Sequence, residues 1–249
     1  MALPPLLIVG LGNPGREYAA SRHNVGWMVV DELSSELGTV DFRKKFCGDF
    51  AKTSIEGRDC FLLKPGTYMN ESGRSVQPAV HFYDTAPEDL LVLHDELDLP
   101  FGEVRLKLGG GHAGHNGLRS IIQHLGTADF VRVRIGIGHA APGFAGDTAD
   151  YVLSSFGPDE RAGLPDVVAK AAAVVRRVAG VGPARAMNEV NTRSKAPAAE
   201  GSGPQGGADC EDEAEERAGA AAGAPGSPHV KASPAGAGDE QVRYKALAG

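Results

Sequence analysis

Through residue 194 the chain alternates short apolar runs with segments whose apolar residues recur every three or four positions. The short runs predict strands at 6–11, 50–55, 59–63, 90–93 and 131–137. The periodic segments predict helices at 25–37, 72–82, 117–125, 159–178 and 183–190. Strands that alternate with helices bury their apolar surfaces by stacking in layers, so the sequence predicts an α/β fold. Ligand sites in such folds lie at the carboxyl ends of strands.

The composition changes sharply near Lys195. All nine Phe and the single Trp lie before it, whereas residues 195–249 are mainly Ala, Gly, Pro, Ser and Glu and include the acidic run 211–216. Such a segment buries too little apolar surface to offset the entropy of ordering it. We therefore expect one folded domain over 1–194 and a disordered acidic tail over 195–249.

The charge is distributed unevenly between these two parts. The net charge is −7; residues 1–194 hold 20 Lys and Arg against 23 Asp and Glu, and residues 195–249 hold 5 against 9. The folded part is therefore close to neutral, and any site for a nucleic acid would have to be a local basic patch that composition does not reveal.

Several sequence features indicate where the protein works. The chain has no run of about 18 apolar residues, so the sequence predicts no membrane span. Its first residues lack the basic region and cleavage site of a signal peptide. The three cysteines are an odd number without metal-ligand spacing, which suits a reducing compartment. We expect a cytoplasmic protein, and a monomer.

The first polar cluster follows the first predicted strand at 10–15. Its letters match the dinucleotide fingerprint G-x-G-x-x-G. Pro14, however, stands where backbone N–H groups would cradle phosphates, and no clean helix begins there. The cluster therefore argues against a nucleotide cofactor.

A histidine precedes a predicted helix, and a carboxylate stands at the end of a predicted strand. His23 lies just before the predicted helix 25–37, which Asn24 could cap. A lone histidine is more often structural, but Asp95 ends a buried apolar run and is well placed to orient an imidazole and fix its tautomer. Around Asp95, we interpret His94 as a packing or hydrogen-bonding residue and Glu96 and Asp98 as solvated or turn residues.

A glycine-rich loop spans 109–117, with five Gly in nine residues. Such a loop lets backbone N–H groups approach a ligand closely. His112 and His115 are spaced like zinc ligands, but no Cys or acidic ligand lies nearby in sequence, so the pattern disfavours a metal. Asn116 either caps the next helix or points its amide into the site.

The remaining polar residues favour activation of a water molecule. Asn13 and Asn70 offer amides that donate and accept hydrogen bonds. No G-x-S-x-G elbow is present, and neither Cys47 nor Cys60 lies in a nucleophile-like context. A His/Asp pair with several asparagines suits a general base better than a protein nucleophile.

At these residues the sequence closely resembles the bacterial peptidyl-tRNA hydrolase family. Tyr18 and six stretches match in order and spacing, at 8–15, 21–24, 64–70, 94–100, 107–117 and 132–138. The similarity covers about residues 5–192 and leaves the tail without a counterpart. It implies a single domain with a twisted mixed sheet between helices, and hydrolysis of the ester between peptide and tRNA without a cofactor or metal.

The resemblance also implies roles for residues of the site. His23 matches the catalytic base, Asp95 the carboxylate that supports it, and Asn13 the residue that separates N-blocked peptidyl-tRNA from free aminoacyl-tRNA. Asn116 would position the water or stabilise the oxyanion, and the sequence leaves both roles open. The residues that would line the crevice for the acceptor end are Tyr18, Tyr68, Asn70 and Asn116.

Lys107 and Arg134 match basic positions associated with the tRNA phosphates. One departure lies in the loop 140–149, where many relatives carry a Lys and this chain has Asp147 and no Lys. The rival hypothesis is a non-catalytic RNA-binding relative, as in plant proteins that resemble the family yet serve splicing. The retained histidine, aspartate and asparagines favour the enzyme, because a pure binder needs no base–carboxylate pair.

Overall fold

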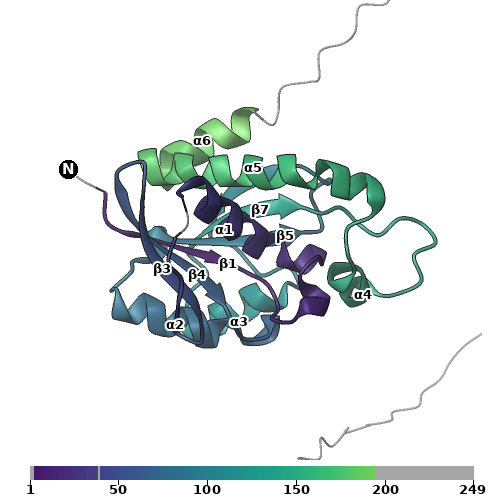
Figure 1. Ribbon diagram of the computed structural model, residues 1–249, viewed down its shortest axis with the longest axis horizontal. Helices are drawn as coiled ribbons and strands as arrows, with labels where there is room; N and C mark the ends of the chain where they lie inside the picture. Colours follow the sequence, from purple (N-terminus) through teal and green to yellow (C-terminus); the bar gives the residue numbers. More distant parts are fainter. Residues whose placement is uncertain (1–2, 39, 194–249) are drawn as a thin grey trace, which may run out of the picture. The chain divides into compact units, whose positions relative to one another are not determined.

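The computed structural model of the protein describes residues 3–38 and 40–193, and the predicted tail lies outside the described residues. Seven strands form one sheet in the order β2-β3-β4-β1-β5-β7-β6 (Figure 1). Their bounds are β1 Leu6–Gly10, β2 Arg43–Lys45, β3 Gly48–Ile55, β4 Arg58–Pro65, β5 Leu90–Glu96, β6 Val104–Leu108 and β7 Val131–Gly136. Strands β4, β1, β5 and β7 are parallel, and antiparallel strands complete both edges. The predicted mixed α/β sheet is confirmed.

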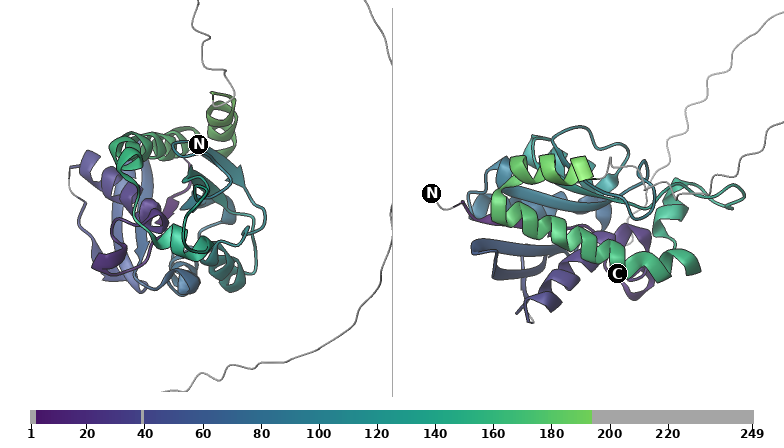
Figure 2. Two further views of the ribbon diagram at one scale, coloured as in Figure 1. Left: turned by 90° about the vertical axis from the view of Figure 1, so that its right-hand side faces the viewer. Right: turned by 90° about the horizontal axis from the view of Figure 1, so that it is seen from above.

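Helices cover both faces of this sheet (Figures 1 and 2). Their bounds are α1 Val25–Glu36, α2 Gly73–Phe82, α3 Asn116–Leu125, α4 Thr148–Leu153, α5 Pro158–Val181 and α6 Pro183–Arg193. Short 3-10 turns lie at Arg16–Tyr18, Arg22–Asn24, Met69–Glu71 and Pro87–Asp89. Helices α1, α5 and α6 pack on one face and α2 and α3 on the other, which gives three layers.

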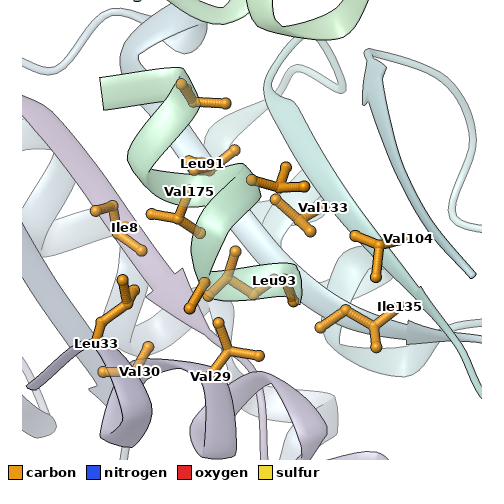
Figure 3. Packing of buried hydrophobic residues seen from close by; sticks show 14 of the residues in the cluster. Ile8, Val29, Val30, Leu33, Leu91, Leu93, Val104, Val133, Ile135 and Val175 are labelled. Carbon is orange, nitrogen blue, oxygen red and sulfur yellow. The ribbon is translucent and has the colours of Figure 1, made fainter. Parts of the chain in front are cut away.

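The central strands divide their side chains between two apolar layers. In β1, Leu6 and Ile8 face α1 and α5, whereas Leu7 and Val9 face α2 and α3, because successive strand residues point to opposite faces. Figure 3 shows Ile8 among residues of α1, β5 and α5. Each such aliphatic side chain contributes about 1.5–3 kcal/mol by leaving water. All seven residues of β5 are buried, and its apolar run at 90–93 predicted this for the first four.

The connections place a crevice at the carboxyl ends of β1 and β5. Helix α1 follows β1 on one face of the sheet, and α2 follows β4 on the other face. The connections after these two neighbouring strands therefore diverge, and a crevice forms between them. Helix α1 packs closely there: a Cβ on Gly26 would lie 2.5 Å from the carbonyl oxygen of Leu93. The turn Arg22–Asn24, which precedes α1, is thereby held at the ends of the strands.

Two strands and one α-helix were not predicted. Strand β2 has the sequence Arg-Lys-Lys and no apolar residue, and β6 is a five-residue edge strand. Helix α4 has six residues, too few to show a helical period. Strands β2 and β6 form by pairing with longer strands, and α4 is stabilised at its own start by a capping box between Asp147 and Asp150. Across residues 3–38 and 40–193, no helix has both the length and the apolarity that crossing a membrane requires.

Candidate active site

One cavity of about 760 Å³ opens at the carboxyl ends of the strands. All nine site residues predicted from the sequence line it, namely Asn13, Tyr18, His23, Tyr68, Asn70, Asp95, Lys107, Asn116 and Arg134. They come from loops after β1 and β4, from the strands β5, β6 and β7, and from the start of α3. Helix α4, at the end of the sheet in Figure 1, adds Val152 and Leu153 to the wall.

A buried histidine–aspartate pair forms the centre of the cavity. Nδ1 of His23 lies 2.8 Å from Oδ1 of Asp95, and the residues are 6% and 4% exposed. Because the carboxylate only accepts, Nδ1 carries the proton and Nε2 of neutral His23 is left as a base. Burial alone would lower the pKa of His23, but the charge and hydrogen bond of Asp95 outweigh burial and raise it.

Asp95 has a second imidazole partner that the sequence did not reveal. Nε2 of His115 lies 3.0 Å from the same Oδ1. The other ring nitrogen of His115 accepts from the N–H groups of Gly117 and Leu118 at 3.1 and 3.3 Å, so Nε2 must carry the proton. Burial opposes ionisation of Asp95, yet the two histidines hold its pKa well below the ordinary value.

The side chain that caps α3 is that of His115, because its ring accepts from the N–H groups of Gly117 and Leu118. The prediction that Asn116 could be the cap is wrong.

The side chains His23, Asp95 and His115 also offer ligand atoms within 4.8 Å of one another, close enough to hold a metal ion. His115 fits this poorly. Its Nδ1 is occupied by two N–H groups of α3, so Nε2 could bind a metal only as an imidazolate or after loss of the helix cap. The donor set fits a hydrogen-bonded base better than a resident metal.

His94 adds no charge to this cluster. Its Nδ1 donates to the backbone carbonyl of Asp95 at 2.7 Å, and its ring packs edge-on against His115. Burial, together with the adjacent ring of His115, lowers the pKa of His94 to about 3, so the His94 ring is neutral at physiological pH. The interpretation of His94 as a packing and hydrogen-bonding residue is confirmed.

Asparagines tie three loops together beneath the cavity. Asn24 accepts from the backbone N–H of Asn13 at 2.9 Å and donates to its carbonyl at 3.0 Å. The prediction that its side chain could cap α1 is wrong, because it makes no hydrogen bond to that helix. Oδ1 of Asn13 accepts from the N–H of Met69 at 2.7 Å. This bond fixes the amide, so the Nδ2 group of Asn13 is the donor available to a ligand.

The basic patch that composition did not show lies on β6 and β7. Arg105 stands opposite Arg134, and Lys107 stands opposite Arg132. Directly opposed residues in neighbouring strands point to the same face, so the four basic side chains gather there. The patch could be predicted only with the register of β6, a strand that the sequence did not indicate.

The cations of this basic patch, and Arg119 of α3, have different partners. Arg134 donates to Glu96 at 2.7 Å, and Glu96 is 8% exposed, so interpreting Glu96 as a solvated residue is wrong. Arg132 is buried and donates to carbonyls of the glycine-rich loop. Lys107 and Arg119 both line the cavity and are exposed, and neither is ion-paired with a described acidic side chain. These two cations are the most available to an anion.

The loop 140–149 has a local reason for its aspartate. Asp147 accepts from the N–H of Asp150 at 2.9 Å, and Asp150 accepts from the N–H of Asp147 at 3.1 Å. Together they form the capping box of α4. Asp147 thus stabilises the helix that lines the cavity.

The family model described as peptidyl-tRNA hydrolase matches residues 7–198. The chain belongs to the peptidyl-tRNA hydrolase family. It is 62% identical over 190 residues to a peptidyl-tRNA hydrolase from Sorangium cellulosum, covering 76% of this chain and 85% of that one. It is 48% identical to one from Mycobacterium tuberculosis, covering 75% of this chain and 97% of the other.

Solved structures agree with this membership. The crystal structure of peptidyl-tRNA hydrolase from Acinetobacter baumannii superposes with a TM-score of 0.68 at 44% identity, covering 75% of this chain and 94% of that chain. The family resemblance seen in the motifs is thus confirmed, and the sheet and helices of this chain are those of peptidyl-tRNA hydrolases.

Proposed function

We propose that this protein hydrolyses the ester bond between the peptide and the tRNA of peptidyl-tRNA, in the cytoplasm, as a monomer and without a metal or cofactor. The observation that carries the proposal is the His23–Asp95 hydrogen bond, which leaves Nε2 as a base within a cavity walled by amides and cations. Membership of the peptidyl-tRNA hydrolase family supports the choice of substrate.

In the proposed reaction His23 acts through water. Nε2 takes a proton from a water molecule, and the resulting hydroxide attacks the ester carbonyl carbon. The tetrahedral intermediate then expels the ribose oxygen, which takes that proton back from the imidazolium. Asp95 holds the ring through Nδ1 and stabilises its charged form. The products are the peptide's carboxylic acid, which loses its proton to solvent, and a tRNA with its hydroxyl restored.

Asn116 is our candidate donor to the oxyanion. Its Oδ1 accepts from Nη2 of Arg119, which leaves the Nδ2 group as the available part of the amide. This Nδ2 group makes no hydrogen bond to the described residues, and a free donor suits a developing negative oxygen better than it suits the positioning of a water molecule. Of the two roles that the sequence left open, this geometry favours oxyanion stabilisation.

A single-turnover assay tests the proposed function against the RNA-binding alternative. Excess protein is mixed with purified N-acetylaminoacyl-tRNA, and both tRNA and free N-acetylamino acid are followed. The enzyme should release both products in equal amounts. Binding of the tRNA with the ester left intact would support the non-catalytic relative instead.

Asn13 is expected to select the N-blocked substrate. Its Nδ2 donor can bind the carbonyl of a blocked amino group but has nothing to offer the ammonium of a free one. Asn13→Asp replaces this donor with a charged acceptor. We expect the preference for N-acetylaminoacyl-tRNA over aminoacyl-tRNA to fall roughly 10–100-fold, the effect of one lost and mispaired hydrogen bond. The ratio of the two kcat/KM values measures it, and an unchanged ratio would remove Asn13 from this role.

Aromatic and amide groups near the cavity mouth suit the acceptor end of the tRNA. Tyr68 is 58% exposed although it lines the cavity, which leaves a ring face for a base to stack on. Tyr18 and Asn70 line the same cavity. We assign these residues to binding of the terminal nucleotides, and the basic patch on β6 and β7 to binding of the phosphates.

Lys107→Ala is expected to weaken tRNA binding in a salt-dependent way. Each phosphate contact releases roughly 0.7–0.9 of a counterion, so losing one should reduce the slope of log affinity against log salt by about that amount. KM should rise more than kcat falls, because a remote charge contact stabilises bound substrate and transition state alike. KM measured across a salt series checks this.

Arg134→Ala provides the matched comparison. Glu96 already neutralises part of the charge of Arg134, so its loss should change the salt slope less than the loss of Lys107. A wild-type slope and KM in the Lys107 variant would place that residue outside the RNA site.

A further inference from the structure

A buried arginine stands beside the proposed base. Arg22 immediately precedes His23, and its side chain is 8% exposed. Nη2 donates to Glu160 at 2.5 Å, and Nη1 donates to Oγ of Ser154 at 2.6 Å and to the carbonyl of Ser155 at 2.8 Å. A guanidinium out of water is costly unless such partners satisfy it, and its planar fork fixes their directions.

The same guanidinium contacts the segment that walls the cavity. Its Cζ lies 4.2 Å from the ring centre of Tyr151 and 5.4 Å from that of Phe156. Tyr151 belongs to α4, whose next residues, Val152 and Leu153, line the cavity. Arg22 is thus packed on the wall helix while its backbone belongs to the turn that carries the base.

Backbone contacts hold this turn on two sides. The N–H of Arg22 donates to the carbonyl of Ser154 at 3.1 Å, and Ser21 forms an isolated bridge with Ser155. On the other side, Asn24 is bonded to the backbone of Asn13. His23 lies between these two anchors, so its direction depends on both.

We propose that Arg22 is a positioning residue: by fixing the turn 22–24 against the segment 151–160, it keeps Nδ1 of His23 on Asp95 and links the base to α4. The proposal rests on the hydrolytic function proposed above. A misplacement of about 1 Å in a catalytic group can cost on the order of 10² in rate. The 2.8 Å bond from His23 to Asp95 is therefore the contact that a loosened turn would lose first.

The test compares Arg22→Lys with Arg58→Lys. Arg58 is also buried, at 4% exposure, and donates to Asp89 and to the carbonyl of Pro4 at 2.6 Å each. It lies at the start of β4, at the end of the sheet away from the cavity. Both substitutions replace a planar fork in a buried ion pair with one ammonium, so both should lower Tm.

The two variants should differ in catalysis. Arg22→Lys should lower kcat about 10–100-fold with little change in KM, because positioning acts on the reacting geometry. The acid limb of kcat/KM should move to lower pH, because a looser bond to Asp95 raises the pKa of His23 less. Arg58→Lys should keep the wild-type kcat and pH profile below its Tm. Equal loss of kcat in both variants, or a wild-type profile in Arg22→Lys, would overturn the proposal.

A milder variant and a measurement on the free protein complete the test. Glu160→Gln keeps Arg22 and can still accept from the N–H of Gly157, a bond that Glu160 makes at 2.6 Å. Glu160→Gln should lower kcat as Arg22→Lys does, but by less, and a wild-type kcat would count against the proposal.

The ¹⁵N signal of His23 Nδ1 should shift in Arg22→Lys and in Glu160→Gln, and an unshifted signal would contradict the positioning role. This signal needs no turnover, so it separates failure of the proposal from failure of the proposed hydrolysis.

Discussion

His23→Ala should lower kcat for peptidyl-tRNA hydrolysis by about 10²–10⁴-fold, the usual contribution of a general base. The change removes Nε2, the base that the bond to Asp95 leaves unprotonated. The change leaves the basic patch on β6 and β7 in place, so tRNA affinity should remain near wild type. Single-turnover release of the N-acetylamino acid, with tRNA binding measured beside it, checks both halves of the expectation.

Two outcomes would contradict this assignment in different ways. Turnover near wild type in His23→Ala would mean that another group activates the water. Loss of tRNA affinity equal to the loss of turnover would mean that the turn 22–24 supports binding and not chemistry. Lys107→Ala serves as the control with the opposite signature, because there KM should change more than kcat.

Asp95→Asn should be at least as damaging, with a loss of kcat of roughly 10⁴, as when the carboxylate of a comparable pair becomes an amide. An asparagine is nearly isosteric but presents both a donor and an acceptor. Its NH₂ group can bond to unprotonated Nδ1 and so favours the tautomer whose Nε2 carries the proton and cannot act as a base. It also deprives His115 of its charged acceptor.

The pH profile distinguishes this effect from unfolding. Neutral His23 is the active form, so wild-type activity is lost as pH falls through its pKa, which Asp95 raises. Without that negative charge, burial is no longer opposed, so the pKa of His23 falls. The acid limb of kcat/KM should therefore move to lower pH although its plateau is lower. An acid limb left in the wild-type position would show that Asp95 does not act on His23.

Much of the fold could be predicted from the sequence alone, because local periodicity encodes it. The buried runs of β1 and β5 and the periodic helices around them were found within a few residues of their bounds. Elements without a pattern of their own were missed: β2 is three charged residues, and α4 is shorter than two helical turns. Strand β2 depends on pairing with β3, and α4 is stabilised by the capping box between Asp147 and Asp150.

The candidate site divides in the same way. Residue types and motif spacing were enough to place His23, Asp95 and Asn13 in one predicted site, and the three residues line one cavity of the structure. They did not reveal His115 as the second partner of Asp95, because His115 lies in a glycine-rich loop whose path does not follow from the sequence, and the contact exists only in the folded chain. Its tautomer follows from capping α3, which a sequence pattern does not show.

Electrostatic roles were decided by tertiary structure alone. In the sequence Glu96 and Asp98 are similar acidic neighbours, yet Glu96 is buried against Arg134 and Asp98 is exposed. Lys107 and Arg134 are similar basic positions, yet the carboxylate of Glu96 neutralises one of them and not the other. The sequence by itself determined the layered fold and which groups could do chemistry, because both depend on residue type and local spacing. The register of β6 on β7, the shared carboxylate of Asp95 and the burial of Arg22 depend on distances between remote segments, and those distances exist only in the folded chain.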